Sequence, residues 1–131
     1  MNALLDTHVL LWWITDDLRL PAYVKSIIAE NKNELFFSAA GCWEIAIKYR
    51  LGKIKLPQKP DIFIIDQLSK NAIQNLPIHA SHALYECNLP NLHRDPFDRM
   101  LVSQSRIEKM PIITGDPLIK QYKVSVIWSK G

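Results

Sequence analysis

Four of the thirteen acidic residues stand in apolar stretches of sequence, where a carboxylate is rarely found without a partner. Asp6 follows ALL, Glu44 lies in AAGCWEIAI, Asp98 lies in PFDRML and Asp116 comes directly after IITG. Four carboxylates in one place cannot all stay ionised without a compensating positive charge, because like charges raise each other's pKa. If the fold brings them together, this all-oxygen set predicts a site for a hard divalent cation, Mg²⁺ or Mn²⁺.

The elements around these acids predict that they meet. Short apolar runs alternate with segments of helical period, a pattern typical of a mostly parallel sheet covered by helices on both faces. The expected strands lie near residues 3–5, 35–37, 73–78, 111–114 and 124–128, and the expected helices include 39–51, a segment from 60, 96–109 and a short segment from 117. Ligands of such sheets bind at the carboxyl ends of the strands. Asp6, Glu44 and Asp116 lie just beyond such ends.

A carboxylate-bound Mg²⁺ ion indicates a particular chemistry. Held by few protein ligands, Mg²⁺ keeps several waters, and one of them can become the attacking nucleophile. The reaction that uses such a pocket is phosphoryl transfer to water, in which metal ions hold phosphate oxygens, activate the water and stabilise the leaving oxygen. The acid set therefore predicts a hydrolase that acts on phosphoesters.

Each acid also has an ordinary explanation as a helix cap or as half of a surface ion pair. Asp6 and Asp116 stand where helices are expected to begin, a position that favours aspartate. Asp95 could cap the helix that carries Asp98, and Glu44 could pair with a lysine one turn later on an exposed face. Caps account for single acids but not for four in apolar strings at one edge. We take Asp95 as the cap and Asp98 as the ligand.

Basic residues suggest the kind of substrate. No acid lies between Ile45 and Pro60, whereas five bases do: Lys48, Arg50, Lys53, Lys55 and Lys59. Arg94 and Arg99 flank Asp98. If a metal neutralises the four acids, sixteen lysines and arginines face nine remaining acids, which leaves a net charge of +7 instead of +3. That field suits a polyanion, although a solvated helix face explains the basic run equally well.

Composition excludes other classes of protein. A length of 131 residues with 48% hydrophobic and 22% charged residues predicts a single globular domain over residues 1–131. No apolar stretch approaches the roughly 20 residues of a membrane span, and no signal peptide is recognisable, so we expect a cytoplasmic protein without membrane contact. The two cysteines and four histidines lack zinc-site spacing, and the four glycines form no phosphate-binding loop.

Three strings resemble one known family. They read LLDTHVLLWW, SAAGCWEIAIKYRLGKIKLP and HRDPFDRMLVSQSRIEKMPIITGD, and they resemble the PIN-domain family, in particular the VapC-type toxins of bacterial toxin–antitoxin pairs. The resemblance covers essentially the whole chain. It implies a three-layer α/β/α sandwich with a five-stranded, mostly parallel sheet. It also implies a Mg²⁺- or Mn²⁺-dependent endoribonuclease, a small cognate antitoxin and a homodimer.

The resemblance also assigns residues. It places the family's acidic quartet on Asp6, Glu44, Asp98 and Asp116, the same acids that the apolar context selects. We expect Asp6 and Asp98 to be the principal metal ligands, and the other two to act through water or a second ion. Substrate contact is expected from residues with a hydroxyl or a positive charge: Thr114, Lys48, Arg50, Lys53 and Arg99. Gly41-Cys42 and the SQS of residues 103–105 depart from the family pattern without touching the acids.

Two other functions remain open at this stage. One is a metal-dependent phosphoesterase that acts on small substrates, which the basic run disfavours. The other is a non-catalytic binding module that keeps the PIN fold and a cation site only for stability. The four intact acids disfavour this second function.

Overall fold

A parallel sheet of five strands forms the centre of the molecule. The computed structural model of the chain describes residues 1–128. In it the strands lie in the order β3-β2-β1-β4-β5 and pair in parallel throughout. Their bounds are β1 Asn2–Leu5, β2 Glu34–Ser38, β3 Ile73–Leu76, β4 Ile112–Ile113 and β5 Val126–Ile127. The predicted five-stranded parallel sheet is confirmed.

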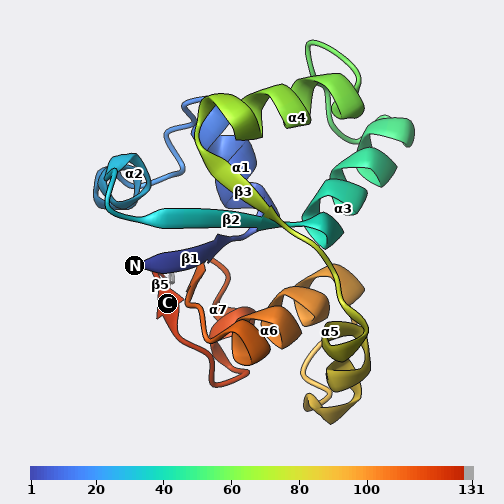
Figure 1. Cartoon of the computed structure of the whole chain (residues 1–131). Coiled ribbons are helices and arrows are strands. Elements are labelled where there is room, and N and C mark those ends of the chain that lie inside the picture. The colour runs from blue at the N-terminus through green and yellow to red at the C-terminus, as the bar shows by residue number, and fades with distance from the viewer. Residues whose placement is uncertain (129–131) are drawn as a thin grey trace.

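Helices cover both faces of this sheet, as the alternating pattern predicts. They are α1 Thr7–Ile14, α2 Ala22–Ala29, α3 Ala39–Arg50, α4 Pro60–Lys70, α5 Ala80–Tyr85, α6 Pro96–Glu108 and α7 Pro117–Lys120, with a 3₁₀ turn, η1, at Glu86–Asn88. In Figure 1, α1, α3 and α4 lie above the central strands, whereas α5, α6 and α7 lie below them. Among the described residues, no helix is both long enough and apolar enough to cross a membrane.

Alternation along β1 supplies both cores. Ala3 and Leu5 belong to a buried cluster with residues of α1 to α4. Leu4, between them, belongs to a second cluster with residues of α6 and α7. Successive side chains of a strand point to opposite faces, so one central strand holds the two helical layers together. This arrangement is the predicted α/β/α sandwich.

The strand order reverses beside β1. The chain runs from β1 outward through β2 to β3, and then returns to place β4 on the other side of β1. Crevices at such a reversal, outside the carboxyl ends of the strands, are where open α/β sheets bind ligands. Asp6 directly follows β1 and Asp116 lies three residues after β4, so both stand at this point.

The outer strands differ from their predicted lengths. β3 ends at Leu76, directly before Pro77, and lies at an edge of the sheet, where a proline is tolerated. β4 and β5 have two residues each, fewer than the ranges 111–114 and 124–128 predicted. Lys123 and Trp128, on either side of β5, have φ angles of 58° and 67°, which interrupt the extended backbone.

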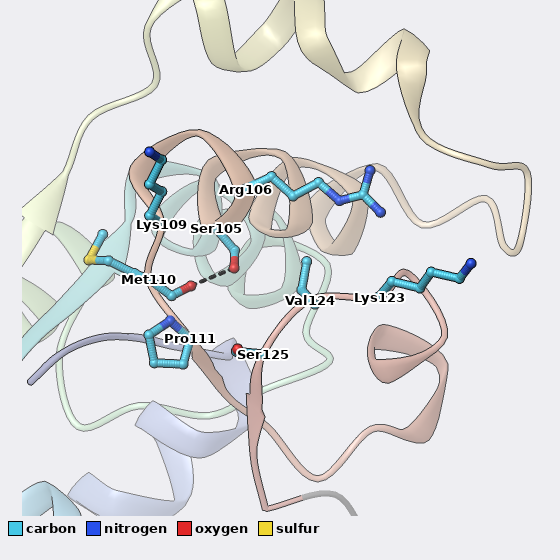
Figure 2. Close-up of a pocket in the computed structure, with 8 residues that line it drawn as sticks. All are labelled: Ser105, Arg106, Lys109, Met110, Pro111, Lys123, Val124 and Ser125. Carbon is cyan, nitrogen blue, oxygen red and sulfur yellow. Dashed lines mark hydrogen bonds between the residues drawn. The ribbon is translucent and has the colours of Figure 1, made fainter.

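The opposite edge of the sheet carries a basic hollow instead of acids. It has a volume of about 290 Å³ and lies between the end of α6 and the amino ends of β4 and β5 (Figure 2). Lys109 ends α6 in the left-handed conformation, and the Ser105 hydroxyl donates to the Met110 carbonyl oxygen at 2.5 Å. In Figure 2 the Arg106 and Lys123 side chains both extend toward the right of the view, whereas Lys109 extends upward at the left.

Close packing around Gly41 provides a test of the fold. A Cβ atom at this position would lie 2.5 Å from Phe37 Cζ, and Phe37 is fully buried. Gly41→Ala is expected to lower the free energy of unfolding by about 1–3 kcal/mol, because overpacking outweighs the higher helix propensity of alanine. Urea denaturation measures the change. Ala46→Ser, on the exposed side of the same helix, should stay within about 0.5 kcal/mol of wild type. A fully stable Gly41→Ala would contradict this packing.

Candidate metal centre

All four predicted acids lie at the carboxyl edge of the sheet. Asp6 occupies the N-cap position of α1, and Asp116 occupies that of α7. Glu44 lies in the second turn of α3, which begins directly after β2, and Asp98 lies in the first turn of α6. Asp6 and Glu44 are only 6% and 5% exposed, so the fold places two of these carboxylates in its interior.

A buried threonine connects the acids that follow β1 and β4. The Thr114 hydroxyl donates to Asp6 Oδ2 at 2.7 Å and accepts the Asp116 N–H at 3.0 Å. Thr114 is fully buried. Its hydroxyl therefore orients Asp6 and ties down the turn that carries Asp116. These contacts support a positioning role for Thr114, and its contact with substrate stays a prediction.

Glu44 has a positive partner on its own helix. Lys48 Nζ donates to Glu44 Oε2 at 2.7 Å, one turn later along α3. The pair was the ordinary explanation for Glu44, but the carboxylate is buried instead of lying on an exposed face. Burial lowers the Lys48 pKa, and the hydrogen bond and charge of Glu44, together with Asp95 and Asp98, raise it by more. Lys48 thus belongs electrostatically to the acid cluster.

Asp98 shows how much negative charge this edge carries. Burial raises the pKa of its carboxyl group, and the charges of Asp6, Asp95, Asp116 and Glu44 raise it further, to about 8. Burial also raises the pKa of Asp6, although the hydrogen bond from Thr114 opposes this effect. The four acids therefore act on one another, as the sequence predicted.

This donor set fits a hard divalent cation. Its ligand atoms are carboxylate oxygens, and a bound cation would offset the burial and the repulsion that together raise the pKa of Asp98 to about 8. Within residues 1–128, no three His, Cys, Asp or Glu side chains stand close enough to form a ready-made metal cage. Mg²⁺ and Mn²⁺ accept carboxylates together with bound waters, so these residues suit them better than they suit zinc.

Space for a ligand adjoins the acids. A cavity of about 230 Å³ is lined by Asp6, His8, Val9, Trp12, Gly115 and Asp116. A narrower crevice on the other side of Asp6 is lined by residues that include Glu44, Phe97 and Asp98. Asp6 and Asp116 thus line the larger hollow, and Glu44 and Asp98 line the crevice.

Arg99 does not occupy the position expected of a substrate contact. Only 8% of it is exposed, and its guanidinium pairs with Glu86. It also donates to the Pro90 carbonyl oxygen at 2.8 Å and to the Tyr122 hydroxyl at 3.2 Å. Its guanidinium is thus paired inside the protein, and its contact with substrate stays a prediction.

The other predicted bases follow α3 away from the acids. Arg50 and Lys53 are exposed, like Lys55 and Lys59 after them. Arg50 lies six residues beyond Glu44, or about 9 Å along the helix axis. Among the lysine and arginine ion pairs of the described residues, only that of Lys48 includes an acid of the cluster, and the later bases are exposed.

The sequence reasoning missed two residues beside Asp98. His93 Nε2 lies 3.4 Å from Asp98 Oδ2, and His93 Nδ1 lies 2.6 Å from the Tyr122 hydroxyl. His93 stands in the string HRDPFD, yet the search for zinc spacing set it aside. Tyr122 carries no local signal, because nothing in a sequence shows which buried tyrosine meets a histidine 29 residues away.

The electrostatics of Asp98 predict an unusual effect of pH on stability. Its folded pKa of about 8 exceeds the ordinary value of 3.8, so its contribution to stability is full below pH 4 and is lost as pH rises toward 8. In metal-free protein, Asp98→Asn should therefore raise the free energy of unfolding by on the order of 1–3 kcal/mol at pH 8.5, and by less at pH 5.

Denaturation in EDTA at both pH values measures this change. At pH 8.5, added Mg²⁺ should reduce the difference in the free energy of unfolding between Asp98→Asn and wild type, because the ion stabilises only the wild-type carboxylate. Asp61→Asn, which removes an exposed acid at the start of α4, serves as the matched control and should change little at either pH. An Asp98→Asn effect of equal size at both pH values would show that the charge cluster does not destabilise the protein.

Comparisons with known proteins agree with this geometry. The chain matches the PIN domain family over residues 3–124. Ribonuclease VapC16 of Mycobacterium tuberculosis (strain ATCC 25618 / H37Rv) is 31% identical over 61 residues, which are 47% of this chain and 43% of that protein, so the match spans less than half of the relative's length.

Solved structures show the same fold. The structure of VapBC2 from Rickettsia felis bound to a DNA fragment from their promoter has a TM-score of 0.72 at 17% identity, over 97% of this chain and 98% of that one. That of VapBC-1 from nontypeable Haemophilus influenzae has a TM-score of 0.69 at 16% identity over the full length of both chains. With its sheet order, its four acids and its match over residues 3–124, the chain belongs to the PIN domain family.

Proposed function

We propose that this protein is a divalent-metal-dependent endoribonuclease, the toxin of a VapC-type toxin–antitoxin pair that acts in the cytoplasm. The observation that carries the proposal is the set of four mutually repelling carboxylates at the reversal of the sheet. The ribonuclease name of the Mycobacterium tuberculosis relative supports it.

Each acid has a task in the proposed reaction. Asp6, fixed by Thr114, and Asp98, in the first turn of α6, present the principal ligand oxygens. Glu44 and Asp116 complete the site through water or a second ion. A bound Mg²⁺ supplies an activated water and neutralises charge on the phosphate. Lys48, paired with Glu44, keeps a positive charge beside the acids, where it can meet a phosphate oxygen.

Exposed bases favour a polymer over a small phosphoester. Arg50, Lys53, Lys55 and Lys59 are exposed, and no ion pair within residues 1–128 joins any of them to an acid of the cluster. A nucleic acid strand offers a phosphate to each of them. RNA is therefore the proposed substrate, and small phosphate esters are the competing class that the assay must include.

An exposed apolar groove supports the proposal of a protein partner. The α3–α4 groove, of about 330 Å³, is lined by Cys42, Trp43, Ala46, Pro60, Asp61, Ile64 and Ile65. Trp43 and Ile65 are 63% and 62% exposed. Large apolar side chains that are exposed together in one groove indicate an interaction site. Grooves of this kind accept the apolar face of a partner helix. We propose a small antitoxin as that partner, and a homodimer as the state of the free toxin.

Loss of Asp6 tests the proposed activity. Asp6→Asn keeps an acceptor oxygen for the Thr114 hydroxyl but removes a ligand charge, so RNA cleavage with Mg²⁺ should fall at least 100-fold while the fold survives. Gel analysis of single-stranded RNA gives the rate, and circular dichroism reports the fold. Glu34→Gln, an exposed acid at the amino end of β2, is the matched control and should cut like wild type.

Three outcomes of this assay would contradict the proposal. If Asp6→Asn cleaves RNA as fast as wild type, the proposed mechanism is wrong. Faster turnover of a small phosphate ester than of RNA would identify the competing phosphoesterase. Stabilisation by Mg²⁺ without any cleavage would identify a binding module.

The α3–α4 groove gives a second test. Ile65→Asp should weaken binding of a co-expressed antitoxin by at least 10-fold, because a charge enters an apolar contact, while RNA cleavage by the free toxin is unchanged. Calorimetric titration measures the affinity. Leu84→Asp, at a residue 73% exposed on α5, is the matched control and should bind like wild type. If wild type, Ile65→Asp and Leu84→Asp bind the antitoxin with equal affinity, the antitoxin does not bind in the α3–α4 groove.

A further inference from the structure

A chain of buried side chains leads from the acid cluster into the protein and is not part of the metal-binding set. We propose that His93 and Tyr122 are positioning residues that hold the Asp98 carboxylate in the orientation that binds the ion, with Arg99 as their fixed anchor. This inference rests on the proposed metal-dependent function, which it extends from the ligands to the groups behind them.

The contacts form an unbroken line. His93 Nε2 lies 3.4 Å from Asp98 Oδ2, and His93 Nδ1 lies 2.6 Å from the Tyr122 hydroxyl. The two rings also pack together, with centroids 5.3 Å apart. Arg99 Nη1 then donates to the Tyr122 hydroxyl at 3.2 Å. The side chain of His93 is 14% exposed and Tyr122 is fully buried, so water competes little for these bonds.

Arg99 sets the direction of every hydrogen bond in this line. A guanidinium can only donate, so the Tyr122 oxygen accepts from Arg99 and its own O–H is left to donate to His93 Nδ1. His93 then carries its proton on Nε2, which faces Asp98 Oδ2. In this arrangement the line presents an N–H donor to the Asp98 carboxylate.

The far end of the line is anchored firmly. Arg99 pairs with Glu86 in η1 and donates to the Pro90 carbonyl oxygen at 2.8 Å. These groups lie in the segment between α5 and α6 that also carries His93. The guanidinium therefore fixes the Tyr122 hydroxyl and the path of the loop together. This explains why an arginine beside a metal ligand points inward.

The line also joins two elements of the site. Asp98 belongs to α6, whereas Tyr122 lies two residues beyond α7, the helix that Asp116 caps. A bond between His93 and Tyr122 therefore links the elements that carry two of the acids. Groups that hydrogen-bond metal-binding carboxylates from behind typically change metal affinity by 10- to 100-fold when they are removed.

Tyr122→Phe tests the inference most directly, because it removes the hydroxyl and keeps the packed ring. The probe is Mn²⁺ alone, titrated calorimetrically into the protein. Its affinity should fall about 10-fold, the half-saturating Mg²⁺ concentration for RNA cleavage should rise by the same factor, and kcat at saturating Mg²⁺ should stay within about twofold. Tyr85→Phe, a partly buried tyrosine packed against the same core cluster, is the matched control and should change none of these values.

Variants of His93 protect the test against misfolding. His93→Ala should weaken Mn²⁺ binding like Tyr122→Phe, and His93→Gln should restore part of it, because an amide N–H can still donate to Asp98. Denaturation in EDTA reports whether each variant is folded. Wild-type Mn²⁺ affinity in folded Tyr122→Phe and His93→Ala would overturn the inference, and so would a loss of kcat without a loss of metal affinity.

The same data separate this inference from the proposed function. A wild-type protein that binds Mn²⁺ but cleaves no RNA, and whose affinity the variants reduce, would overturn only the proposed ribonuclease. A wild-type protein that binds no Mn²⁺ would overturn the positioning role. If the wild type cleaves RNA and all variants bind Mn²⁺ with the same affinity, the proposed ribonuclease function would stand and the positioning role of His93 and Tyr122 would be wrong.

Discussion

Repulsion between carboxylates at the carboxyl edge of the sheet is the constraint around which this protein is organised. Burial and neighbouring charge together keep the pKa of Asp98 near 8. Each surrounding contact lowers, in a different way, the energetic cost of holding these carboxylates together. Thr114 donates a hydrogen bond to Asp6, Lys48 places a cation beside Glu44, and backbone N–H groups of α7 and α6 satisfy Asp116 and Asp95. Without such contacts, the fold would be least stable at the edge that carries its four acids.

The two hydrophobic cores supply the stability that offsets the repulsion between carboxylates at this edge. β1 contributes side chains to both, and the helices on each face cover it. Asp6 and Asp116 cap such elements, and Asp98 and Glu44 lie in the first and second turns of theirs, so apolar packing that does not itself involve charge fixes their positions. A rigid frame of this kind lets like charges stay close together, because moving them apart would expose apolar surface. Stability elsewhere in the molecule therefore sustains a destabilised site.

The sequence indicated the four acids well because each follows a strand or begins a helix, and local pattern locates such places. The α/β/α layers followed from the same alternation of apolar runs. Local pattern could not show which bases stay in solvent: Arg99 and Arg50 look alike in sequence, yet one is 8% exposed and pairs with Glu86 while the other lies on the surface. It also could not show contacts between distant residues. Asp6 and Thr114 are 108 positions apart, and only the pairing of β1 with β4 brings them together.

That long separation has a consequence for the life of the protein in the cell. Asp6 is synthesised before its partners on the far side of the site, and Thr114 follows it only 108 positions later. The quartet is therefore incomplete on any growing chain until β4 has emerged and paired with β1. A site assembled from segments this far apart cannot form on the growing chain before its last acid has been synthesised, so the four acids can act together only after that point.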